Sequence, residues 1–209
     1  MSIDPSLKQY IETVIIPQYD HFDAAHHRDH AQDVIDRSLE LAKHYEVNIN
    51  IVYAIAAFHD TGLCEGRETH HVVSGRIIRK DAFLKHHFTE QEIETMAQAA
   101  EDHRASADHE PRSIYGKIVS EADRIIIPHK IIMRTIQYGL SHYPELGKEA
   151  QYQRFKEHML EKYSEHGYIK LWLPESENAP RLLELQEIIR NEAMLKNAFN
   201  STWDEIEKA

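Results

Sequence analysis

Apolar residues recur along this chain at the spacing of helices, and this pattern predicts most of its elements. A helix over about residues 30–45 carries a single apolar stripe. The next helix, about residues 49–59, is apolar on nearly all sides through its segment IVYAIAAF, which is typical of a helix at the centre of a core. Gly62 is expected to end that helix just after His59 and Asp60.

The rest of the chain continues the helical pattern. A shorter helix is expected within 70–83. Thr89 and Glu92 have the spacing of a capping box and open a helix with an apolar face. The polar run RASADHEPRS is expected to be a loop, and helical spacing resumes at Ile114 and continues toward Pro128. Three further helical segments are expected at 129–143, 148–163 and 179–199.

The fold class follows from what the pattern contains and lacks. The chain has 209 residues, of which 42% are hydrophobic, so it can bury one core, with or without a small helical extension. It has almost no alternating β-branched segments and only 7 glycines and 7 prolines. The sequence therefore predicts an all-α protein.

Charge and cysteine content restrict the classes of partner. The 24 lysines and arginines against 35 aspartates and glutamates give a formal net charge of −11, which disfavours nucleic acid and anionic membranes as main partners. Small molecules and divalent cations fit better. Cys64 is the single cysteine, which excludes an internal disulfide and suits a reducing compartment. With no signal-like start and no apolar stretch of about 18 residues, we expect a cytoplasmic protein.

Histidine is the compositional anomaly, because the chain has 16 and most of them precede residue 110. Divalent metals are bound by neutral imidazoles and ionised carboxylates that converge from several elements. His30 starts one predicted helix, His59 and Asp60 end the next, and Asp123 lies late in another. Adjacent residues of a regular helix diverge by about 100°, so the His59–Asp60 doublet can reach one ion most naturally at a helix end. A buried core histidine is the alternative for His59.

Three local sequences resemble the HD superfamily of metal-dependent phosphohydrolases: AHHRDHAQDV, AIAAFHDTG and KIVSEADR. The resemblance covers about residues 20–140. It implies an all-α HD-domain helical bundle at 1–145. Residues 146–209 carry no motif of that family and are expected to form a C-terminal helical extension packed on this core. The resemblance also implies that the first metal is held by four ligands: His30, His59, Asp60 and Asp123.

Members of that superfamily with two or more metals add two histidines, and the matching positions here are His71 in HVVSG and His103 in AAEDHR. The resemblance makes both ligands of a second ion, with a buried core histidine as the alternative for each. His70, the neighbour of His71, is expected at the surface.

The order of these motifs is similar to that of the HD-type symmetrical dinucleoside-tetraphosphate hydrolases. This similarity includes Arg67 before the third histidine and Arg134 after the last aspartate. Arg67, Arg104 and Lys117 are candidates to bind phosphate oxygens, with surface salt bridges as the equal alternative.

The expected activity is hydrolysis of a small phosphoester, with nucleotides as the first candidate class. Asp60 and His59 are the expected catalytic residues, and the cofactor is one or two divalent ions drawn from manganese, iron, zinc, nickel and magnesium. Two alternatives remain open: a non-catalytic metal-dependent nucleotide sensor, and a di-iron oxygenase similar to inositol oxygenase. The exact substrate and the formation of a homodimer are also left open.

Overall fold

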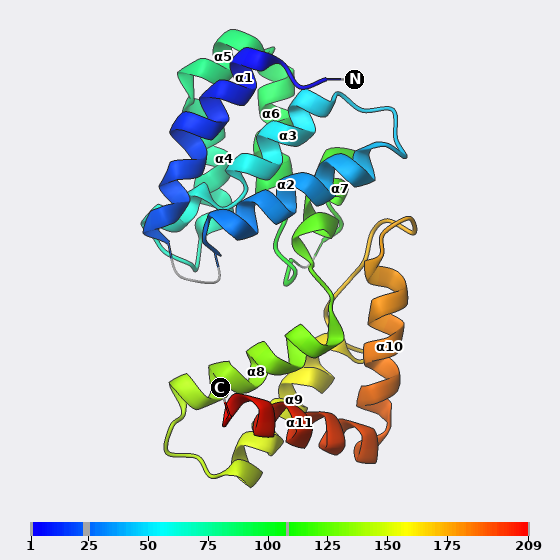
Figure 1. The fold of residues 1–209 in the computed structure, drawn as a ribbon. Coiled ribbons are helices and arrows are strands. Elements are labelled where there is room, and N and C mark those ends of the chain that lie inside the picture. The colour runs from blue at the N-terminus through cyan, green and yellow to red at the C-terminus, as the bar shows by residue number, and fades with distance from the viewer. Residues whose placement is uncertain (1, 23–25, 108, 209) are drawn as a thin grey trace. The chain divides into compact units, whose positions relative to one another are not determined.

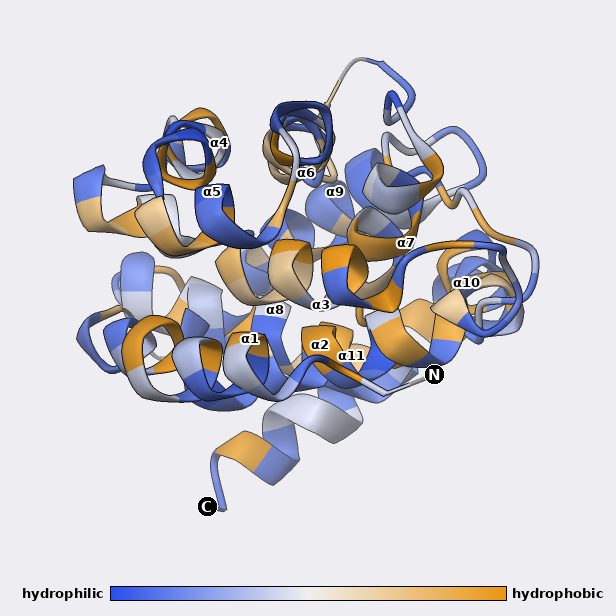
Figure 2. Cartoon of the chain, turned by 90° about the horizontal axis from the view of Figure 1, so that it is seen from above, coloured by the Kyte–Doolittle hydropathy of each residue, from blue (hydrophilic) through white to orange (hydrophobic). Residues whose placement is uncertain are grey.

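The computed structural model describes residues 2–22, 26–107 and 109–208. Throughout these ranges the regular elements are helices and no strand occurs, so the predicted all-α class is confirmed. The chain divides into two compact units, the first formed by Met1–Arg124 with Trp172–Ser176 and the second by Ile125–Leu171 with Glu177–Ala209. Figure 1 shows the helices of each unit, and their ribbons carry the mixture of apolar and polar residues expected of amphipathic helices (Figure 2).

The first unit contains the segments that carry the candidate metal ligands. Its elements in chain order are α1 (Pro5–Tyr10), a π-helical turn η1 (Ile11–Ile15), a 3₁₀ turn η2 (Ile16–His21), α2 (Arg28–Ala42), α3 (Ile49–Phe58), a 3₁₀ turn η4 (Thr61–Glu65), α4 (His70–Lys80), α5 (Ala82–His87), α6 (Glu90–Glu101) and α7 (Ile114–Asp123).

Helix α3 is the centre of the first unit, as its uniformly apolar sequence predicts. Every residue from Ile51 to Phe58 is buried. Helices α2, α6 and α7 all contact α3. Because these helices surround α3, the residue that follows it, His59, is also held in the interior.

Local capping explains where several helices begin. The Asn48 side chain accepts a hydrogen bond from the backbone of Asn50 and caps α3. Thr89 and Glu92 form the predicted capping box of α6. The single helix expected within 70–83 is instead two helices, because Asp81 ends α4 in an extended conformation and its carboxylate accepts from the Leu84 amide to start α5.

The second unit consists of α8 (Pro128–His142), α9 (Lys148–Tyr163), α10 (Asn178–Arg190) and α11 (Glu192–Ile206). The continuous pattern over 179–199 is broken at Asn191, whose side chain caps α11 by accepting from two backbone amides. The apolar core of this unit includes Phe155, Met159, Leu185 and Phe199.

The predicted domain boundary after residue 145 differs from the structure, which places it at Arg124–Ile125. Helix α8 packs with α9 and α11 of the second unit. The sequence shows helical spacing but not which helices share a core, so the structural boundary lies before α8 rather than after it. The short segment Trp172–Ser176, by contrast, belongs to the first unit. Leu173 is buried there in the apolar core, and the Trp172 amide donates to the Glu121 carboxylate. The packing of a C-terminal extension on the core stays a prediction.

Within the described ranges, none of the helices combines the length and the apolar character needed to cross a bilayer.

Candidate metal centre

The His59–Asp60 doublet lies where α3 ends. His59 still has helical backbone angles (φ −53, ψ −36), whereas Asp60 has left the helix (φ −108, ψ 4) and η4 begins directly after it. The change in backbone direction between them brings both side chains to one side. The expectation that the doublet needs a helix end is therefore met.

A buried tyrosine supports this helix end. The Tyr19 hydroxyl donates to the Ala57 carbonyl at 2.9 Å and accepts from the Asp60 amide at 3.3 Å. Thr61 adds a hydrogen bond from its hydroxyl to the Phe58 carbonyl at 2.7 Å. These bonds satisfy backbone groups that the end of α3 would otherwise leave buried without partners.

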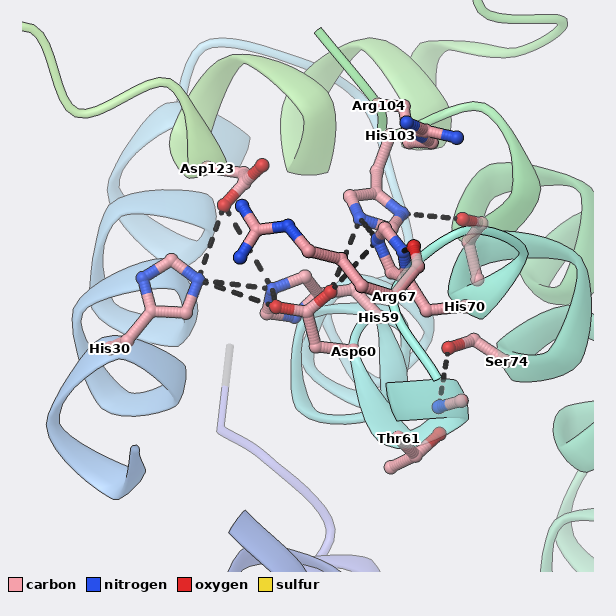
Figure 3. Close-up of polar contacts among 12 residues, drawn as sticks. His30, His59, Asp60, Thr61, Arg67, His70, Ser74, His103, Arg104 and Asp123 are labelled. Carbon is pink, nitrogen blue, oxygen red and sulfur yellow. Dashed lines mark hydrogen bonds and ion pairs between the residues drawn. The ribbon is translucent and has the colours of Figure 1, made fainter. Parts of the chain in front are cut away.

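The four predicted ligands of the first ion meet at one point (Figure 3). His30 comes from the first turn of α2 and Asp123 is the last residue of α7. The His30 Nε2 atom lies 3.2 Å from Asp123 Oδ1 and 3.6 Å from Asp60 Oδ2. The His59 Nε2 atom lies 3.3 Å from the same Asp60 Oδ2 and 3.4 Å from His30 Nε2. We call these four residues the first ligand group.

The other oxygen of Asp60 faces a second set of histidines. Asp60 Oδ1 lies 3.3 Å from His70 Nε2 and 3.4 Å from His103 Nε2, and these two nitrogens are 3.2 Å apart. We call Asp60, His70 and His103 the second ligand group. Asp60 is buried and belongs to both groups, one oxygen to each.

The structure places His70, rather than the predicted His71, in the second ligand group. His70 is the first residue of α4, and the side chain of the next residue is rotated by about 100° around the helix. The His71 Nδ1 atom is buried without a hydrogen-bond partner, and burial, with the charge of Arg104, lowers the pKa of His71 to about 4. The expectation that His70 is a surface residue is therefore wrong, because the start of α4 turns it toward Asp60.

The ring orientations of three histidines are set by their own backbone. The Nδ1–H groups of His59, His70 and His103 donate to the carbonyls of Ala56, Arg67 and Ala100 at 2.7, 2.7 and 2.6 Å. Each acceptor lies three residues earlier in the chain. A ring that donates from Nδ1 keeps its Nε2 lone pair for a ligand or a proton.

These tautomers make the cluster fit a cation. In the second ligand group the two Nε2 atoms face each other at 3.2 Å, so two neutral rings would oppose their lone pairs unless a proton or a metal ion lay between them. Two ligands that each lie about 2.0–2.2 Å from one ion are separated by roughly 3.0–3.6 Å. The nitrogen and oxygen separations of 3.2–3.6 Å in both groups match this spacing, and that between His59 Nε2 and Asp123 Oδ1 is longer, at 3.9 Å. The donor set therefore fits divalent metal binding.

The carboxylates of the cluster are stabilised in their charged form. Burial opposes ionisation of Asp60, but the surrounding histidines, His59 and His103 first, outweigh it and hold the pKa of Asp60 well below its usual range. Burial acts in the same way on Asp123, and the hydrogen bond from His30 lowers the pKa of that carboxyl. Both ligand groups therefore offer negative charge to a cation.

The pKa values of three histidines in the cluster shift in different directions, upward for His30 and His103 and downward for His70. Burial disfavours the charged form of His30, but Asp123 and Asp60 outweigh it and raise its pKa from 6.5 to about 10. Burial likewise opposes protonation of His103, and its hydrogen bond to Asp60 raises its pKa. Burial, with the charge of His103, lowers the pKa of His70. In the metal-free protein, protons on His30 and His103 thus occupy the positions suited to cations.

Metal binding at pH 7 is expected to release roughly one to two protons, because His30 and His103 must become neutral to coordinate. The raised pKa of His30 stabilises the metal-free fold fully below pH 6.5, and this contribution is lost as the pH rises through about 10. Apparent metal affinity changes in the opposite sense and rises with pH. Calorimetric titration with Mn²⁺ in buffers of different ionisation enthalpy measures the release, and heats that do not depend on the buffer would contradict it.

Replacement of His70 by alanine is expected to lower manganese binding from about two ions per chain to about one, since the second ligand group would keep only two side chains. His71→Ala is the matched control and is expected to leave the count unchanged, because its ring is outside the group. Metal analysis after gel filtration measures both. Loss of an ion in His71→Ala with full binding in His70→Ala would restore the assignment made from the sequence.

The four predicted phosphate-binding residues have different surroundings. The side chain of Arg67 reaches across the cluster from the loop before α4 (Figure 3). Arg104 donates to the Glu68 carbonyl at 2.9 Å, and its charge acts on His70 and His71. Lys117 instead pairs with Glu110. This contact is a salt bridge of the kind that the sequence offered as the alternative to phosphate binding.

Arg134 is exposed on α8, in the second unit, whereas the cluster belongs to the first unit, and its contact with substrate stays a prediction.

Sequence reasoning missed a close contact that positions His70. The Gly62 amide donates to the Ser74 hydroxyl at 2.9 Å, and a Cβ on Gly62 would lie 2.0 Å from the His70 carbonyl oxygen. Gly62 therefore allows η4 to touch the first turns of α4, in addition to ending α3. The position of Gly62 shortly after the His59–Asp60 doublet was the one sign of this contact in the sequence, but the contact itself depends on where α4 packs.

Comparison with known proteins agrees with this geometry. The family model described as HD domain matches residues 28–126, a range that contains every residue of both ligand groups. No curated protein and no solved structure matches the chain at a significant level. Residues 28–126 of this chain are therefore similar to the HD-domain family.

Proposed function

We propose that this chain is a metal-dependent phosphohydrolase that acts on a small phosphoester, with nucleotides as its first candidate substrate class. The single observation that carries the proposal is the division of Asp60 between two ligand groups, one carboxylate oxygen facing each. Such a shared carboxylate suits two divalent ions. Bound there, the ions would supply an activated water and polarise a phosphoryl oxygen.

The remaining residues bind and orient the substrate in this proposal. The two ligand groups contain two carboxylates, Asp60 and Asp123, so two divalent ions leave the centre with net positive charge. Arg67 and Arg104, which lie next to the cluster, add cations that can bind phosphate oxygens. A locally positive centre explains how a chain with a net charge of −11 attracts an anion.

The ligand groups have different numbers of protein ligands, and this difference indicates where substrate binds. The first group supplies four side chains and the second supplies three. Catalytic metal sites keep coordination positions open for water or substrate. We therefore assign the phosphate to the side of His70 and His103, where Arg104 also lies.

The test is a phosphate-release panel on purified protein loaded separately with manganese, iron, magnesium, zinc or nickel. It includes nucleoside mono-, di- and triphosphates, dinucleoside polyphosphates and sugar phosphates. Metal-dependent release from at least one nucleotide is the expected result, and Arg67→Ala should raise KM or lower kcat by a modest factor. Nucleotide binding that raises the melting temperature without any phosphate release would favour the sensor instead.

A further inference from the structure

A clamp at the base of the loop that follows α6 lies directly beside His103. Asp102 is the C-cap residue of α6 and is buried, with 1% of its surface exposed. A buried carboxylate is costly unless its oxygens are paired. Arg112 supplies the close partners at the other end of the loop, so this pair joins the two ends of the segment 103–111.

The contacts between the two residues are numerous. The Arg112 backbone amide donates to Asp102 Oδ2 at 2.8 Å, and its guanidinium donates from Nη2 to Oδ1 at 2.7 Å and from Nε to both oxygens at 3.0 and 3.1 Å. The same guanidinium donates to the Gln98 carbonyl at 3.2 Å and to Glu101 at 2.8 Å. It thereby places positive charge at the carboxyl end of α6, where the helix dipole favours it.

His103 directly follows the clamp residue Asp102 and lies beyond the last helical residue of α6, Glu101. Its carbonyl accepts from the Ser120 hydroxyl at 3.3 Å, and its ring donates to Ala100. Consecutive Cα atoms are about 3.8 Å apart, so a shift of Asp102 moves His103 with it. Metal coordination tolerates errors of only about 0.2 Å in ligand distance.

We propose that the Asp102–Arg112 pair is a positioning device for the second ligand group, and that it sets the affinity of that group for a divalent ion by fixing His103. The proposal rests on the metal binding of the proposed function. It assigns Asp102 and Arg112 no contact with substrate. The first ligand group, held by α2, α3 and α7, contains neither His103 nor either residue of the clamp.

The test compares Arg112→Lys with Arg79→Lys in metal-free protein titrated with Mn²⁺ and followed by electron paramagnetic resonance. Arg112→Lys keeps a positive charge but loses the forked contacts with Asp102. Arg79 is the matched control, since it also pairs with Glu101, and with Glu94, but it does not contact Asp102. We expect Arg112→Lys to weaken binding of the second equivalent of Mn²⁺ about 10- to 100-fold and to leave binding of the first unchanged. Arg79→Lys should change the binding of neither equivalent.

Equal weakening of both equivalents, or no change in Arg112→Lys, would overturn the proposal, as would wild-type protein that binds a single ion. If Arg112→Lys does not fold, Asp102→Asn tests the same contact, because it keeps the shape and removes the charge that Arg112 pairs with. Full binding of the second ion by folded Asp102→Asn would then count against the clamp. Wild-type protein that binds two ions without releasing phosphate would contradict the proposed function but not the clamp, because the clamp is tested by metal binding and not by phosphate release.

Discussion

Asp60→Ala is expected to remove the second metal ion, weaken binding of the first and reduce phosphate release to background, a loss of at least about 10³-fold. The reason is that Asp60 contributes one oxygen to each ligand group. Without it, the first group keeps three side chains and the second keeps only two histidines. The pKa of the attacking water would then stay far above about 7, the value that metal-bound water has at such centres. Metal analysis and phosphate release measure the two losses.

Asp123→Ala is the matched comparison, because Asp123 contacts His30 and His59 of the first group only. It should lose or weaken one ion and keep His70 and His103 paired with Asp60. Circular dichroism of both variants checks that the helices persist. Retention of two ions by folded Asp60→Ala would contradict the shared carboxylate and, with it, the basis of the proposed function.

Gly62→Ala is expected to lower the free energy of unfolding by about 1–3 kcal/mol and to weaken the second ion selectively. The added Cβ would lie 2.0 Å from the His70 carbonyl oxygen and 2.6 Å from the Ser74 amide, and both are backbone atoms that cannot rotate away. The start of α4 must therefore move, and His70 moves with it. Chemical denaturation and manganese titration measure the two effects.

Gly147→Ala provides the control for the loss of a glycine. A Cβ added at Gly147 would meet no atom within 4 Å, and this residue caps α9 in the second unit. Its cost should stay below about 1 kcal/mol, with metal binding unchanged. Ser74→Ala removes only the hydroxyl that accepts from Gly62 and should have an effect between the two. Unchanged metal binding in Gly62→Ala would show that α4 tolerates the displacement.

Much of the fold could be predicted from the sequence because helix formation depends on local spacing and caps. The all-apolar run of α3 indicated its central place, and Thr89 with Glu92 marked the start of α6. The break at Asp81 was not predictable in the same way, since the carboxylate that starts α5 also accepts from Tyr10, a residue far away in the chain.

The sequence by itself determined the chemistry of the centre: the ordered pattern of His30, the His59–Asp60 doublet and Asp123 specified a metal-binding donor set before any geometry was known. Only the tertiary structure decided between His70 and His71. These residues are neighbours of identical type, and the choice depends on the contact of Gly62 with α4, which rotates one ring toward Asp60 and the other away. Which unit α8 joins was likewise decided by long-range packing, because an amphipathic stripe shows that a helix has a partner without showing which one.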